Sequence, residues 1–174
     1  MAVDEKTKAA AWSQIRQFGD PVLMEASHDV VVDDEVRKLA DRMIKIMHAA
    51  DGVGLAAPQI GVLRKIIVFV LDKEVNVMIN PRISWMSDET ITDAEGCLSL
   101  ASLAVDVERA KAVKVEGEDL EGNPLIFEEE GLRARILQHE VDHLEGMMII
   151  NRTSREQRKD LMARLRKVRL PGED

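Results

Sequence analysis

The sequence predicts an α+β domain in which short strands of mixed arrangement pack around helices. Runs of β-branched residues bounded by turn signals fill the middle of the chain, and segments with helical spacing of apolar residues lie on either side. These helices and strands do not alternate regularly, which argues against a parallel α/β sheet. With 174 residues, the chain is long enough to bury the core of one domain, which we take to span residues 1–174.

The composition excludes several functional classes. No run approaches the roughly 18 uninterrupted apolar residues that a membrane span needs. Residues 1–14 lack the apolar core and cleavage site of a secretion signal. The net charge of −8 argues against binding to DNA. The single cysteine, Cys97, rules out an intrachain disulfide and indicates a reducing compartment, so we expect a cytoplasmic protein with no membrane partner.

The first third of the chain predicts one helix. Residues 1–14 are polar and rich in alanine, and we expect them to be loose. Residues 18–23 (FGDPVL) predict a turn that leads into an extended segment. Residues 34–49 carry apolar side chains at helical spacing, with Asp33 or Asp34 as the N-cap.

The middle of the chain predicts strands. Residues 65–71 (KIIVFVL) form a buried strand, and residues 75–80 (VNVMIN) form its neighbour, which Pro81 ends. Residues 104–119 alternate well enough for one or two further strands. Residues 120–130 predict a hairpin with an outgoing strand.

Two helices are predicted after the strands. Residues 131–145 have helical spacing, and Gly146 ends this helix. Residues 154–170 predict a C-terminal helix that begins with a Ser-x-x-Gln capping box at Ser154 and Gln157.

The helix over residues 131–145 contains the sequence His-Glu-x-x-His. Positions i and i+4 lie on one face of a helix, so His139 and His143 can share a metal ion. Glu140 is offset from that face but near enough to accept a proton from a water on the ion. The alternative is that two histidines lie there without a metal. We favour a metal-binding helix, with short β-sheets packed around it.

Two histidines do not complete a catalytic site, because a tetrahedral ion takes three protein ligands and a water. One group of metallopeptidases has a third histidine six residues after the second, and here that position is Ile149. Another group takes a glutamate from a later helix, for which Glu156 is the candidate. Cys97 is the remaining candidate for the third protein ligand of a catalytic ion. A closed structural site would need a fourth ligand, for which His48 is the candidate.

Two further motifs and the His-Glu-x-x-His helix follow one another in a fixed order. They are Gly-Val-Gly-Leu-Ala-Ala-Pro-Gln (52–59), Glu-Gly-Cys-Leu-Ser (95–99) and Gln-His-Glu-Val-Asp-His-Leu (138–144). Together they resemble the peptide deformylase family, over roughly residues 15–155. The resemblance implies a metallohydrolase that removes the formyl group from the N-terminal formyl-methionine of newly synthesised polypeptides and releases formate.

The resemblance also implies the residues that carry the chemistry. The three protein ligands of one divalent ion would be Cys97, His139 and His143. In the family this ion is natively Fe(II), and zinc, nickel or cobalt are accepted. Glu140 would act as general base and acid. The side chain of Gln59 and the backbone N–H of Leu98 would stabilise the oxyanion that forms from the formyl carbonyl.

A pocket for the substrate's methionine side chain is implied beside the metal-binding helix. Gly54 would let the backbone approach the substrate, so that a peptide adds as an extended strand. Plain core packing is the alternative role for Leu132. The candidate substrate-binding residues are Val53, Gly54, Glu95, Gly96, Leu132 and Ile136.

The sequence departs from the family motif after Ser99. The family has a proline and a bulky or basic residue where this chain has Ala101 and Ala104, and an arginine is frequent at Met24. We expect the loss of proline to loosen the turn. The small Ala104 would remove a wall or a cation from the substrate groove.

The C-terminal helix is basic in an acidic chain. From Arg152 to Arg169 there are eight Lys or Arg residues and two acidic ones. One interpretation is a solvated helix face. The other, implied by the resemblance, is contact with ribosomal RNA near the exit of the nascent chain, which would depend strongly on salt.

Overall fold

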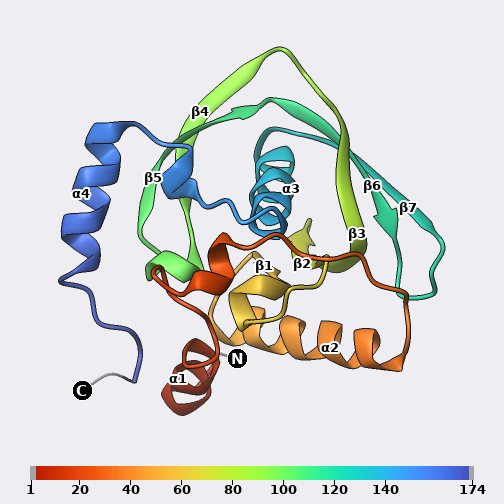
Figure 1. Ribbon diagram of the computed structural model, residues 1–174, viewed down its shortest axis with the longest axis horizontal. Helices are drawn as coiled ribbons and strands as arrows, with labels where there is room; N and C mark the ends of the chain where they lie inside the picture. Colours follow the sequence, from red (N-terminus) through yellow and green to blue (C-terminus); the bar gives the residue numbers. More distant parts are fainter. Residues whose placement is uncertain (1–2, 173–174) are drawn as a thin grey trace.

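The computed structural model describes residues 3–172 and has an α+β architecture (Figure 1). Within these residues there are four α-helices, and none of them has the length and apolar character to cross a membrane. They are α1 (Glu5–Trp12), α2 (Asp34–Ala49), α3 (Gly131–Leu144) and α4 (Arg155–Leu165). The mixed α+β class predicted from the sequence is confirmed.

All strand pairs are antiparallel. The main sheet has the order β1-β2-β3-β6-β7. Its strands are β1 (Gly54–Ala56), β2 (Ile66–Leu71), β3 (Glu74–Met86), β6 (Ala112–Glu118) and β7 (Pro124–Glu130). In the part of the chain that the structure describes, strands β4 (Thr90–Gly96) and β5 (Ala104–Ala110) pair only with each other and form a separate ribbon. Figure 1 shows α3 between this ribbon and the main sheet.

Two opposite faces of α3 are buried against different partners. Ala134, Leu137, Val141 and Leu144 recur at helical spacing and pack in one apolar cluster with residues of the main sheet such as Phe69. The face that bears His139 carries polar side chains, and these are also buried. Because buried polar groups need partners, the contacts of this second face determine what the site can do.

Helix α2 has the predicted bounds. The carboxylate of Asp33 accepts a hydrogen bond from the N–H of Val36 (2.8 Å), which identifies Asp33 as the N-cap. Its apolar residues lie in the same cluster as those of α1.

The prediction that Pro81 ends its strand was wrong. Strand β3 continues through Pro81 to Met86. Its register with β6 shifts between Ile79 and Arg82, and Asn80 has a positive φ of 50°. A proline lacks the N–H that a regular ladder needs, and this bulge accommodates it.

Helix α4 is shorter than predicted, because it ends at Leu165 rather than at residue 170. Ser154 caps it by accepting a hydrogen bond from the N–H of Gln157 (3.2 Å). The side chain of Gln157 reaches Asp106 on β5 instead of returning to Ser154. The predicted capping box is therefore half formed, and its second half ties α4 to the ribbon.

Residues 5–12, in the segment expected to be loose, form α1. Asp4 caps this helix, and Ala11 and Trp12 are buried against α2. A run of three alanines favours a helix, and burial of the indole stabilises it further. Residues 1 and 2 lie outside the described residues.

Candidate metal centre

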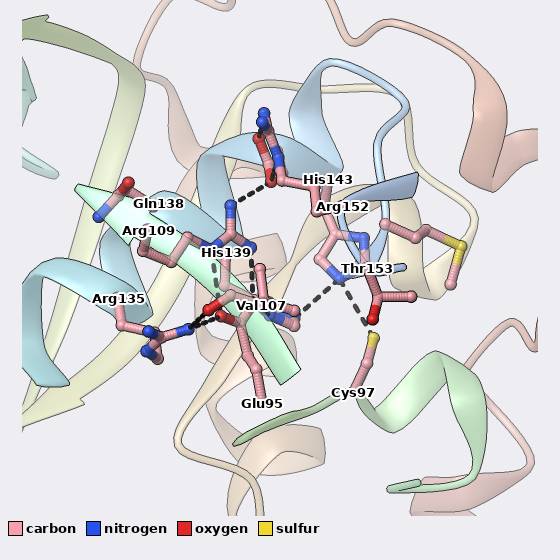
Figure 2. Close-up of polar contacts among 12 residues, drawn as sticks. Glu95, Cys97, Val107, Arg109, Arg135, Gln138, His139, His143, Arg152 and Thr153 are labelled. Carbon is pink, nitrogen blue, oxygen red and sulfur yellow. Dashed lines mark hydrogen bonds and ion pairs between the residues drawn. The ribbon is translucent and has the colours of Figure 1, made fainter. Parts of the chain in front are cut away.

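Three potential metal ligands lie together in the interior. The ligand atoms of Cys97, His139 and His143 lie within 4.8 Å of one another, and all three residues are buried. Sγ of Cys97 is 3.4 Å from Nε2 of His143, which is 3.1 Å from Nε2 of His139 (Figure 2). Among residues 3–172 no fourth histidine, cysteine or carboxylate joins this group. Three protein ligands are the number that a catalytic zinc-type site uses, since the fourth position of a tetrahedral ion would then be left for water or substrate.

Glu95 orients the first histidine of the group. Nδ1 of His139 lies 2.6 Å from Oε1 of Glu95, so the ring donates from Nδ1 and turns the lone pair of Nε2 toward Cys97. The same carboxylate accepts two hydrogen bonds from Arg109, at 2.6 and 3.1 Å. Glu95 thereby fixes the ring and remains ionised beside it.

The electrostatics of these groups suit a bound cation. Burial raises the pKa of Glu95, but the hydrogen bonds from His139 and Arg109 outweigh it and hold this pKa well below its ordinary value. Burial lowers the pKa of His143 well below its ordinary value, which keeps its imidazole neutral. Burial also lowers the pKa of His139, but contacts with Cys97 and Glu95 raise it above the ordinary value. The ionised Glu95 beside His139 and the neutral ring of His143 are compatible with a bound cation, and the soft thiol and two imidazoles fit a divalent transition metal.

Glu140 points a free carboxylate oxygen into the same region. It is buried, and its Oε2 has no hydrogen-bond partner among the described residues. Burial raises the pKa of Glu140 to about 7, while the nearby charge of His139 lowers it. A Cβ atom added at Gly54 would overlap this carboxylate. Only glycine therefore allows the backbone of β1 to approach Glu140 so closely.

Gln59 contacts both its own turn and the metal-ligand group. Its Oε1 accepts a hydrogen bond from the N–H of Ala56 (2.9 Å). Its Nε2 donates to the hydroxyl of Ser99 (3.2 Å) and lies 3.9 Å from Sγ of Cys97. The side-chain amide thus accepts the hydrogen bond from its own turn and still places an N–H donor beside Cys97.

A cavity of about 270 Å³ opens onto these groups. Val53 and Leu132 are exposed at its mouth, with 59% and 71% of their surface accessible. Its walls include all six candidate substrate-binding residues together with Gln59, Cys97, Leu98, His139 and Glu140. His143 lies behind this wall, so the sequence candidates are brought together at one site.

The turn after Cys97 differs from the expected loose loop. Ala101 has a positive φ of 52°, a conformation closed to proline, whose ring fixes φ near −65°. The side chain of Gln17 accepts a hydrogen bond from the N–H of Ala101 (3.2 Å) and donates one to the carbonyl of Leu98 (3.1 Å). The N-terminal segment therefore holds the turn that carries Cys97 and Leu98.

An ion network that begins at the cavity wall, with Glu95 and Arg135, and continues behind it was missed in the sequence. Arg109 bridges the carboxylates of Glu95 and Asp142, and Arg135 donates to Glu95 (Figure 2). Arg135 and Asp142 lie four residues before and three residues after His139. This spacing places them on the face of α3 that bears His139, and it was the one signal that could have revealed them.

Comparison with known proteins decides the family. The model of the polypeptide deformylase family matches residues 12–159. The chain belongs to this family. A peptide deformylase of Dictyoglomus thermophilum is 44% identical over 144 residues, which cover 82% of this chain and 94% of that protein.

Solved structures of peptide deformylases share the fold. The Thermotoga maritima structure has a TM-score of 0.78 at 42% identity and covers 80% of this chain and 96% of that one. The Legionella pneumophila structure has a TM-score of 0.84 at 35% identity, and the match covers 88% of this chain and 92% of that one. Peptide deformylases are metalloenzymes that hydrolyse the N-formyl group of new polypeptides. The resemblance drawn from the three motifs is confirmed.

Proposed function

We propose that this chain removes the formyl group from the N-terminal formyl-methionine of newly synthesised polypeptides. It would do so as one catalytic domain over residues 1–174, with α3 as a central metal-binding helix. The observation that carries the proposal is the group of Cys97, His139 and His143 beside the unpartnered carboxylate of Glu140. Release of formate from a formyl-methionyl peptide tests it, as set out in the Discussion.

Cys97, His139 and His143 would hold one divalent ion, natively Fe(II), with zinc, nickel or cobalt as substitutes. When bound, the ion supplies Lewis acidity that makes hydroxide available near neutral pH. Through its contact at Nδ1, Glu95 would hold the ring of His139 so that Nε2 is the atom offered to the ion. Metal analysis of protein purified without oxygen identifies the native ion.

Glu140 would take the proton from the attacking water and return it to the departing amine. A pKa of about 7 suits both transfers at neutral pH, because neither protonation state is strongly favoured. Because Gly54 has no side chain, the carboxylate of Glu140 can lie directly against the backbone of β1 at the cavity wall. Such general acid–base catalysis contributes about 10²- to 10⁴-fold.

Gln59 and Leu98 would stabilise the developing oxyanion with the amide Nε2 and the backbone N–H. The position of Gln59 is fixed at Oε1 by Ala56, so Nε2 needs little reorganisation during the reaction. The turn that bears Leu98 is held by Gln17.

We expect Gln59→Ala to lower kcat by about 10²- to 10³-fold, because one oxyanion donor is lost, and to change KM little. Steady-state kinetics with a formyl-methionyl peptide checks this. Gln14→Ala is the matched control, since Gln14 is half-buried, bonds Arg42 and does not line the cavity. A kcat for Gln59→Ala within threefold of the wild-type value would show that Gln59 only supports its turn.

The substrate's methionine side chain would enter the cavity between Val53 on one side and Leu132 and Ile136 on the other. Gly54 and Gly96 border the same cavity and leave room for the peptide backbone. Glu156, the ligand that a peptidase would need, lies on α4 and does not line it. This geometry favours the deformylase over the peptidase.

The basic residues of α4 would contact ribosomal RNA. They are exposed, whereas Leu161 of the same helix is buried against the ribbon side of the core. Deleting the helix would therefore disturb the fold, and reversal of surface charge is the sharper test.

Changing Arg158, Lys159 and Arg166 to glutamate is expected to weaken co-sedimentation with ribosomes at least tenfold, because each phosphate contact adds to the salt-dependent affinity. Turnover of a short formyl-methionyl peptide should stay within twofold. Reversal of Lys38 and Lys45 on α2 and of Arg82 on β3 to glutamate, all exposed and outside α4, changes the net charge equally and is the control. Unchanged co-sedimentation of the α4 variant would leave the helix as a solvated face.

A further inference from the structure

Strand β4 forms one wall of the cavity, but it belongs to a ribbon outside the main sheet. Ala94, Glu95 and Gly96 line the cavity, and Glu95 is the one buried residue of the strand. Within residues 3–172 its only strand partner is β5. The position of this wall therefore depends on what ties the ribbon to α3.

Most hydrogen bonds between the ribbon and the helices are made by β5. Gln138 on α3 bonds both the N–H and the carbonyl of Ala110 (3.1 and 2.9 Å), and Gln157 on α4 bonds Asp106. On β4, the side chain of Glu95 bonds His139 at the end nearest the metal ligands. The other half of β4, which contains Ile91, makes a different contact with α3.

Arg135 on α3 holds that half. Its guanidinium donates to the carbonyl of Ile91 on β4 and to the carbonyl of Val107 on β5, each at 2.8 Å (Figure 2 labels Arg135 and Val107). It also donates to Glu95 (2.8 Å), and its side chain is 7% exposed. One planar group thus spans both strands of the ribbon, which a single ammonium cannot do.

The charge of Arg135 is not required to balance the network. Without it, the carboxylates of Glu95 and Asp142 still face the guanidinium groups of Arg109 and Arg152. Among these charged side chains of the helices and the C-terminal segment, Arg135 is the one that hydrogen-bonds the ribbon backbone, at the carbonyls of Ile91 and Val107 and more weakly at that of Asp93 (3.5 Å).

We propose that Arg135 is a positioning residue that clamps the β4–β5 ribbon to α3 and thereby sets the affinity for peptides that extend along β4. This rests on the proposed deformylase function. Ala94, Glu95 and Gly96 line the cavity and residues 90–93 do not, so a peptide that extends beyond the cavity along β4 would run over the part of the strand that Arg135 holds. Loss of the clamp should weaken binding of longer substrates most, because the strand must then be ordered on binding.

The test compares metal-loaded wild type with Arg135→Met, Arg135→Lys and the control Arg133→Met. Arg133 lies two residues earlier on α3, is half exposed and pairs with Asp72 and Glu129 away from the ribbon. Hydrogen–deuterium exchange is measured over residues 90–96. Kinetics are measured with formyl-Met-Ala and with a formyl-methionyl hexapeptide.

We expect Arg135→Met to speed exchange over residues 90–96 at least tenfold. KM for the hexapeptide should rise about tenfold and KM for the dipeptide less than threefold, with kcat and metal content nearly unchanged. Arg135→Lys should lie between this variant and wild type, and Arg133→Met should match wild type. If Arg135→Met does not fold, Arg135→Lys carries the test alone.

Unchanged exchange and an unchanged ratio of the two KM values would overturn the proposal. So would a fall in kcat and metal content at constant KM, because Arg135 would then act through Glu95 and His139. If wild type releases no formate, the exchange data still test the clamp, and the deformylase function fails separately.

Discussion

Glu140→Gln is expected to lower formate release by about 10²- to 10⁴-fold, because an amide cannot accept the proton of the attacking water. The metal content should stay at one ion per chain, since Glu140 is not among the three clustered ligands. Glutamine has nearly the size of glutamate, so the new side chain still fits against the backbone of Gly54. Steady-state kinetics with metal analysis of the same samples checks both expectations.

The stability of Glu140→Gln distinguishes a catalytic role of Glu140 from a structural one. The pKa of Glu140 is raised in the folded protein, so its ionisation above the ordinary pKa opposes folding. Glu140→Gln should therefore be at least as stable as wild type near pH 8 while it is nearly inactive. Glu145→Gln, at the exposed end of α3, is the matched control and should keep full activity. An active Glu140→Gln protein would exclude Glu140 as the base.

Cys97→Ala is expected to lose the metal as well as the activity. Mutation of residues that hydrogen-bond to metal ligands costs about 10- to 100-fold in metal affinity. Loss of the one anionic ligand itself should cost at least about 100-fold. Formate release should fall to background unless metal is in large excess. Metal titration followed by dialysis measures the affinity.

Cys97→Ser extends this test to the alternative enzyme. A peptidase that took its third ligand from elsewhere would retain the metal after either change. Because Cys97 is the only cysteine, titration of thiols also reports whether metal protects it in wild type. Retention of one tightly held ion by both variants would contradict the assigned ligand set.

The parts of the structure that the sequence predicts well are local ones. Asp33 and the apolar spacing of α2 gave its bounds, because capping and helix period depend on neighbouring residues. The motifs at residues 52–59, 95–99 and 138–144 pointed to residues that line one cavity or lie directly behind it. Only the fold brings Cys97 to the two histidines, and the sequence reached that pairing through resemblance.

The parts that were missed depend on contacts between distant segments. Strand β4 is almost wholly exposed, so it lacks the apolar alternation that marks a strand. Pro81 looked like an end of a strand because a bulge depends on the partner strand. Arg135 resembles any surface arginine of a helix until the ribbon covers it. Glu95, taken as a pocket wall, also bonds His139 and two arginines.

The most direct test of the central claim is formate release from formyl-Met-Ala-Ser by wild-type protein that holds one metal ion per chain. We predict turnover, with formate and Met-Ala-Ser formed in equal amounts, and about 10²- to 10⁴-fold less from Glu140→Gln under the same conditions. No formate from fully metal-loaded wild type would contradict the account.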